Sequence, residues 1–171
     1  MKDMEKSITL IGLPGCGKTT VGNLLSDKLN YEFIDMDFYI EKKQGKTIIE
    51  LFKNGEDYFR SIETETCREL GEKGKTIISS GGGVVKKAIN IEYLKNNSIV
   101  VFIDRPVENI LSDIEVEKRP LLANGKEVLY KLYDERYNLY KNYCDYRVEN
   151  TGSLDEIVDK IANLISIKIW L

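Results

Sequence analysis

The chain has 171 residues, of which 42% are hydrophobic and 31% are charged. This composition is typical of a folded globular protein, and the length suits one domain, residues 1–171, with a sizeable core. A net charge of -3 argues against a general nucleic-acid or anionic-membrane surface. The chain has no histidine, so acid–base chemistry would have to use carboxylates, lysine, tyrosine or cysteine.

The first residues, MKDMEK, lack the apolar region of a secretory signal, and no apolar run is long enough to span a membrane. The three cysteines are an odd number without metal-ligand spacing, which favours a reducing compartment. We therefore expect a cytoplasmic protein without a membrane or nucleic-acid partner.

Strand and helix patterns alternate along the chain. In chain order they predict a strand at 7–11, helix 19–29, strand 31–34, helices 38–43 and 47–52 around Gly45, helix 58–70, strand 76–79, helix 88–95, strand 99–103, a helix begun by Asp104-Arg105-Pro106, helix 128–143, strand 146–149, and a last helix capped by Ser153 and Glu156. This alternation predicts an α/β fold, with a parallel sheet that carries helices on both faces.

A glycine-rich turn follows the first strand. Its pattern is Gly12-x4-Gly17-Lys18-Thr19, typical of a phosphate-binding loop. The glycines let backbone N–H groups surround phosphates, Lys18 can reach the outer phosphates, and the Thr19 hydroxyl can hold Mg²⁺. The loop predicts a bound nucleoside triphosphate, against the alternative of a chance glycine turn. It leaves the acceptor open among water, a protein side chain, a nucleotide and a small metabolite.

The segment FIDMD places Asp35 and Asp37 at the carboxyl end of the second strand, where open α/β sheets bind ligands. One carboxylate could hold a metal-bound water, and the other could accept a hydrogen bond from an acceptor hydroxyl. The alternative is a solvated turn, or Asp37 as the N-cap of a helix that begins at Phe38.

Two further segments carry candidate substrate contacts. In GEDYFRSIE, Glu63 could hold the Arg60 guanidinium toward an anionic substrate, although an ordinary surface pair has the same spacing. In IISSGGGVV, three glycines directly after a strand suggest a backbone that a ligand approaches closely. Ser79 or Ser80 could touch a metal-bound water.

Two more arginines lie in the second half of the chain. Residues 113–126 lack a clean period, which fits a mobile lid that brings Arg119 over the phosphates, or else a plain solvated loop. In DERYNLY, Arg136 and Tyr140 share one helix face, so Arg136 is either a second anion clamp or ordinary surface charge.

Together, the segments FIDMD, GEDYFRSIE, SSGGG, RPLL and RYNLY resemble the shikimate kinase family, in order, from Ile8 to about Ile165. The resemblance implies a three-layer α/β/α sandwich of the P-loop NTPase type, with a central five-stranded parallel sheet and a mobile lid. It also implies transfer of a phosphoryl group from ATP to the 3-hydroxyl of shikimate by a monomeric enzyme that uses Mg²⁺.

The resemblance assigns roles residue by residue. It implies that the phosphate loop and the lid bind ATP, and that Thr19 and Asp35 bind Mg²⁺. A carboxylate, two arginines and the glycine turn would bind shikimate. The catalytic residues would be Lys18, Asp37 and Arg119. The implied sets are Gly15, Cys16, Gly17, Lys18, Thr19, Thr20 and Arg119 for ATP, and Asp37, Arg60, Gly81, Gly82, Gly83 and Arg136 for shikimate. Residues 147–151 would surround the adenine.

Two alternatives remain. One is another small-molecule kinase of this fold, such as a gluconate or nucleoside-monophosphate kinase. The other is a catalytically silent relative that binds nucleotide and transfers nothing. A regulatory GTPase is not expected, because no Asn-Lys-x-Asp motif occurs.

Overall fold

The structure is a computed structural model that describes residues 5–117 and 125–169. The elements, in chain order, are β1 Ser7–Ile11, α1 Lys18–Leu29, β2 Glu32–Asp35, α2 Met36–Gln44, α3 Ile48–Phe52, α4 Glu56–Leu70, β3 Thr76–Ser79, the 3-10 turn η1 Val84–Lys86, α5 Ala88–Lys95, β4 Ser98–Asp104, α6 Val107–Glu117, α7 Gly125–Tyr143, β5 Tyr146–Glu149 and α8 Leu154–Ile169.

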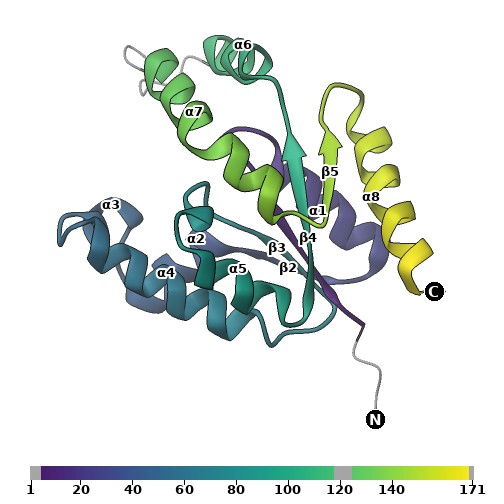
Figure 1. Cartoon of the computed structure of the whole chain (residues 1–171), viewed down its shortest axis with the longest axis horizontal. Helices are drawn as coiled ribbons and strands as arrows, with labels where there is room; N and C mark the ends of the chain where they lie inside the picture. Colours follow the sequence, from purple (N-terminus) through teal and green to yellow (C-terminus); the bar gives the residue numbers. More distant parts are fainter. Residues whose placement is uncertain (1–4, 118–124, 170–171) are drawn as a thin grey trace.

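The sheet has five parallel strands in the order β2-β3-β1-β4-β5. Helices α1 and α8 pack together on one face, while α4, α5 and α7 lie toward the other (Figure 1). Every residue of β1 and β4 is buried, as expected for strands covered on both faces. The predicted three-layer α/β/α sandwich with five parallel strands is therefore confirmed.

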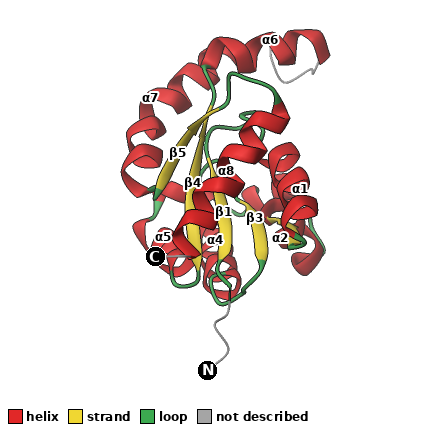
Figure 2. Cartoon of the chain, turned by 90° about the vertical axis from the view of Figure 1, so that its right-hand side faces the viewer, coloured by secondary structure: helices red, strands yellow, loops and turns green. Residues whose placement is uncertain are grey.

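Parallel strands present their carboxyl ends at one edge of the sheet (Figure 2). The phosphate loop follows β1, Asp37 follows β2, the glycine turn follows β3, Arg105 follows β4 and Asn150 follows β5. The fold thus gathers five distant segments at the edge where α/β proteins bind ligands.

Several predicted boundaries need correction. The second strand ends at Asp35 instead of 34, and α2 begins at Met36 instead of Phe38. The cap of α2 is consequently Asp35, whose carboxylate accepts a hydrogen bond from Phe38 N, so the alternative that Asp37 caps this helix is wrong. The chain turns directly from strand into helix here, and the apolar pattern of so short a segment does not mark the junction.

The segment predicted as a lid, residues 113–126, is helical at both ends. Helix α6 continues to Glu117 and α7 already begins at Gly125, so residues 113–117 and 125–126 are helical. The proposed lid residue Arg119 lies outside the described residues.

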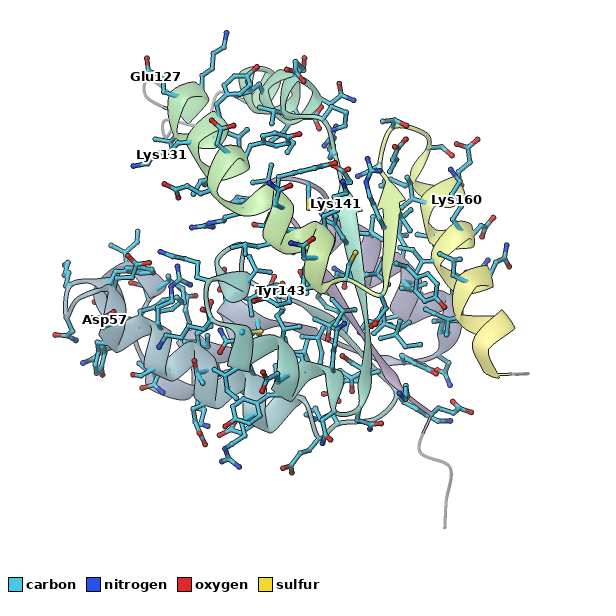
Figure 3. The ribbon with its side chains drawn as sticks, viewed as in Figure 1. Asp57, Glu127, Lys131, Lys141, Tyr143 and Lys160 are labelled. Carbon is cyan, nitrogen blue, oxygen red and sulfur yellow. The ribbon has the colours of Figure 1, made fainter. Side chains whose placement is uncertain are left out.

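Charged side chains such as Glu127, Lys131 and Lys160 project from the outer sides of α7 and α8 (Figure 3). Within the described ranges, none of the helices combines the length and the apolar character that a membrane crossing requires.

Candidate active site

The phosphate loop joins β1 to α1 by a backbone that only some residues can adopt. Gly17, the N-cap of α1, has φ 104, in the left-handed region that glycine tolerates at low cost. Lys18 is buried, and its Nζ donates to Gly12 O at 2.8 Å and to Leu13 O at 3.0 Å. The ammonium group and the positive end of α1 therefore place positive charge within this loop.

A cluster of oxygen atoms lies beside the first turn of α1. The Thr19 hydroxyl donates to Asp35 Oδ2 at 3.1 Å and lies 3.4 Å from Ser79 Oγ. Ser80 instead donates to Leu10 O at 2.8 Å, so Ser79 is the serine on this side. Hydroxyl and carboxylate oxygens beside a phosphate loop fit Mg²⁺, which prefers hard oxygen ligands and keeps several waters.

A pocket of about 570 Å³ opens over these groups. Its lining includes Gly15, Gly17, Lys18, Thr19 and Thr20 from the loop, and Asp35, Asp37, Ser79, Gly81 and Gly82 from the neighbouring strand ends. The volume falls within the range of small-molecule sites. The fold therefore brings most of the predicted nucleotide, metal and acceptor residues to one cavity.

The three consecutive glycines each allow a different side chain to approach the backbone. A Cβ added at Gly81 would lie 3.0 Å from Asp37 Oδ1, and one at Gly82 would lie 3.5 Å from an Arg136 nitrogen. At Gly83 it would lie 2.4 Å from an Arg60 nitrogen. The glycine turn thus admits the Arg60 guanidinium at Gly83 and the Asp37 carboxylate at Gly81, whereas at Gly82 the tightest neighbour is Pro14, at 3.0 Å, and Arg136 lies at ordinary contact distance.

Arg60 is held from several sides. Its Nη1 donates to Glu63 Oε1 at 2.7 Å, and its Nε donates to Glu56 Oε1 at 3.3 Å. The guanidinium also lies over the rings of Phe52 and Phe59, at 5.8 and 5.3 Å from their centroids. Arg60 is only 7% exposed, so the expected role of Glu63 in positioning it agrees with the contacts.

Arg136 reaches the same turn from α7. Its Nε is buried and, among the described residues, has no hydrogen-bond partner. Tyr140, one helical turn further on, is fully buried and donates its hydroxyl hydrogen to Gly82 O at 2.5 Å. Tyr140 also stacks on Phe102 of β4, with ring centroids 5.3 Å apart, which fixes α7 against the sheet. An unpartnered guanidinium nitrogen is suited to receive an anionic group.

Two carboxyl groups beside the glycine turn have pKa values shifted in the same direction. The pKa of Asp37 is raised above 3.8 because neighbouring atoms desolvate its charged form and Asp35 repels it, with Lys18 opposing. The pKa of Glu63 is also raised, chiefly by burial, although Arg60 pulls it down. Carboxyl groups whose pKa values are shifted by burial and by neighbouring charges are typical of functional sites.

Some predicted residues lie beside the cavity instead of lining it. Gly83 does not line it, and neither do Arg60 and Arg136, which approach Gly83 and Gly82 of the turn; the Cys16 thiol is buried next to Lys18 Nζ, at 3.7 Å. Of residues 147–151, Arg147, Glu149 and Thr151 line a separate pocket of about 440 Å³ between β5, α6 and α7.

Sequence reasoning missed two contacts at the site. Arg105 lines the main pocket and pairs with Asp113 of α6 at 2.5 Å. Asn150, after β5, donates to the Cys16 carbonyl oxygen at 2.8 Å. Neither contact has a local sequence signal, because each depends on how β4 and β5 lie beside the phosphate loop.

The fold and this site define a P-loop phosphotransferase that acts on a small molecule. The phosphate loop, the hydroxyl–carboxylate cluster and Asp37 line the pocket, and two arginines approach the glycine turn beside it.

The comparisons with known proteins agree. The family model described as shikimate kinase matches residues 14–166. The shikimate kinase of Clostridium botulinum (strain Alaska E43 / Type E3) is 56% identical over 162 residues, which cover 95% of this chain and 98% of that protein. A solved shikimate kinase from Acinetobacter baumannii in complex with shikimate has a TM-score of 0.87 and 38% identity, covering 97% and 96% of the two chains.

A gluconokinase from Sinorhizobium meliloti, at 15% identity and a TM-score of 0.63, shares the fold alone. The chain belongs to the shikimate kinase family.

Proposed function

We propose that the protein transfers the γ-phosphoryl group of ATP to the 3-hydroxyl of shikimate, giving shikimate 3-phosphate and ADP. The observation that carries the proposal is the convergence of Asp37, Arg60 and Arg136 on the three glycines beside the phosphate loop. Shikimate is a small ring with a carboxylate on one side and hydroxyls on the other. A site with two cationic groups and one carboxylate matches that arrangement.

The nucleotide side of the reaction belongs to the phosphate loop. Backbone N–H groups of residues 15–20 would bind the phosphates, and Lys18 would move from the loop carbonyls to the outer phosphates. Thr19 and Asp35 would hold Mg²⁺, directly or through water. When bound, this ion neutralises phosphate charge and orients the group to be transferred.

The acceptor side belongs to the glycine turn. Arg60 and Arg136 would bind the shikimate carboxylate, and the backbone of Gly81, Gly82 and Gly83 would line the ring. Asp37 would accept a hydrogen bond from the acceptor hydroxyl and orient its oxygen toward the phosphorus atom.

In the transfer itself, the bond from the acceptor oxygen to phosphorus forms while the bond to the leaving ADP oxygen breaks. The hydroxyl proton passes to the Asp37 carboxylate. Little covalent chemistry falls to the protein, so positioning and charge stabilisation supply the rate. Arg119 would approach the transferring group from the lid and exclude water, which limits ATP hydrolysis.

The remaining expectations complete the proposal. We infer a single domain, a monomer in the cytoplasm, and no partner among nucleic acids or membranes. A net charge of -3 supports the last of these, because polyanionic partners favour a basic surface.

The test is ADP release from ATP and Mg²⁺ in the presence of shikimate, gluconate, AMP or no acceptor. The proposal expects strong stimulation by shikimate alone. Stimulation by gluconate or AMP instead would assign the pocket to another acceptor. Nucleotide binding without stimulation by any acceptor would identify a silent relative.

A further inference from the structure

We propose that Asn150 is a positioning residue for the phosphate loop, and that it orients the peptide between Cys16 and Gly17 for nucleotide binding. The proposal rests on the nucleotide site described above and adds to it a residue from the opposite end of the chain. Asn150 follows the edge strand β5 and is 8% exposed, so its amide is directed into the protein.

The contact joins segments that are 134 residues apart. Asn150 Nδ2 donates to the carbonyl oxygen of Cys16 at 2.8 Å. The same nitrogen would lie 2.9 Å from a Cβ added at Gly17, so the amide packs directly against the loop backbone. The Asn150 backbone is itself fixed, because its N–H donates to Asp104 O at the end of β4, at 2.8 Å.

The consequence follows from peptide geometry. A trans peptide is planar, and its carbonyl and N–H groups point in opposite directions. When Asn150 holds the Cys16 carbonyl toward itself, the Gly17 N–H must point away from Asn150. Gly17 lines the main pocket and begins α1, so this N–H joins the donors that would surround a phosphate.

The left-handed backbone of Gly17 makes this restraint useful. Glycine allows many orientations, so a loop that depends on Gly17 loses conformational entropy when it binds a ligand. A buried side chain that selects the binding orientation in advance would lower that cost. Asn150, just after the end of β5, would therefore raise nucleotide affinity by orienting the loop backbone, although its amide does not itself contact the nucleotide.

The experiment measures the dissociation constant of MgADP by calorimetry for the wild-type protein and for Asn150→Ala. Asn97→Ala is the matched control, since Asn97 Nδ2 donates to Lys73 O at 3.0 Å, before β4 and away from the phosphate loop. Each variant loses one side-chain hydrogen bond to a backbone carbonyl. Melting temperature and the shikimate KM at saturating ATP are measured in parallel.

We expect Asn150→Ala to weaken MgADP binding roughly tenfold, the size of one hydrogen bond, with the shikimate KM within twofold of wild type. Asn97→Ala should lower the melting temperature but leave MgADP affinity unchanged. An Asn150→Ala affinity within twofold of wild type, or an equal loss in both variants, would overturn the proposal. If Asn150→Ala does not fold, Asn150→Ser, whose hydroxyl is too short for this contact, takes its place.

A wild-type protein that does not bind MgADP would contradict the nucleotide site as a whole. A wild type that binds MgADP, with no selective loss of affinity in the Asn150 variant, would contradict the positioning role alone. The two failures are therefore distinguishable.

Discussion

Replacing Gly83 by alanine tests the substrate site with a single methyl group. The Gly83 backbone has φ -94, which alanine adopts without strain. The added Cβ would nevertheless lie 2.4, 2.5 and 2.7 Å from the Nη2, Nη1 and Cζ atoms of Arg60. These distances are far inside van der Waals contact, so either the guanidinium or the glycine turn must move.

The size of the effect follows from the Arg60 environment. A displaced guanidinium would lose its 2.7 Å bond to Glu63 and its stacking on Phe52 and Phe59. The guanidinium would also no longer be oriented to hydrogen-bond the substrate carboxylate. A charge-assisted hydrogen bond contributes about 1.5–3 kcal/mol, which corresponds to a rise of roughly 10- to 100-fold in the shikimate KM.

The assay is coupled ADP release at saturating ATP, with shikimate varied. Gly45→Ala is the control for adding a methyl group, because a Cβ at Gly45 meets nothing within 4 Å. Its φ of 65 makes that variant less stable, but its shikimate KM should not change. A Gly83→Ala enzyme with a KM within twofold of wild type would refute the role given to Arg60.

Two other substitutions extend the test. Asp37→Asn should abolish transfer while MgADP still binds. Folding raises the Asp37 pKa, so the charged carboxylate lowers the stability of the native protein at neutral pH, and the uncharged variant should melt at a higher temperature. A lower melting temperature, or a transfer rate near that of the wild type, would contradict these expectations. In the wild type, kcat/KM for shikimate should fall at acidic pH as the shikimate carboxylate and Asp37, whose pKa is raised, take up protons; any residual activity of Asp37→Asn should keep only the fall that the substrate causes. Tyr140→Phe removes the hydroxyl that donates to Gly82 O and that also hydrogen-bonds the Arg136 side chain, so the shikimate KM should rise about three- to tenfold, the size of a hydrogen bond, and less than in Arg136→Ala. An equal effect on the ATP KM would disprove a selective role.

The parts of the site that sequence reasoning predicted are those with local signals. The phosphate loop is contiguous, and Arg60 with Glu63 is an i, i+3 pair on one helix. The topology rule that parallel strands share a carboxyl edge then placed Asp35 and Asp37 beside the loop. These predictions could be made without knowing the order of the strands or how the side chains pack.

The parts that it missed depend on packing between segments distant in sequence. The Asn150 contact requires that β5 end beside the phosphate loop, and the pairing of Arg105 with Asp113 requires that α6 extend at least to Asp113. The α2 boundary was missed for a different reason, because both Asp35 and Asp37 are good N-cap residues and only backbone geometry decides between them.

The strand order has a consequence for folding. Asp37 follows the edge strand β2 and the glycine turn follows its neighbour β3, while the phosphate loop follows the central strand β1 and Asn150 follows the other edge strand, β5. Residues 1–85 contain the phosphate loop, Asp37, Arg60 and the glycine turn but lack Arg136 and Asn150, so a sheet formed by the first half alone offers an incomplete binding site. A ligand that binds only the native state adds about 2.7 kcal/mol to its stability at 100 times the dissociation constant. Substrates would therefore protect the assembled sheet as one cooperative unit, and hydrogen exchange in β2 and β5 should slow together when both are bound.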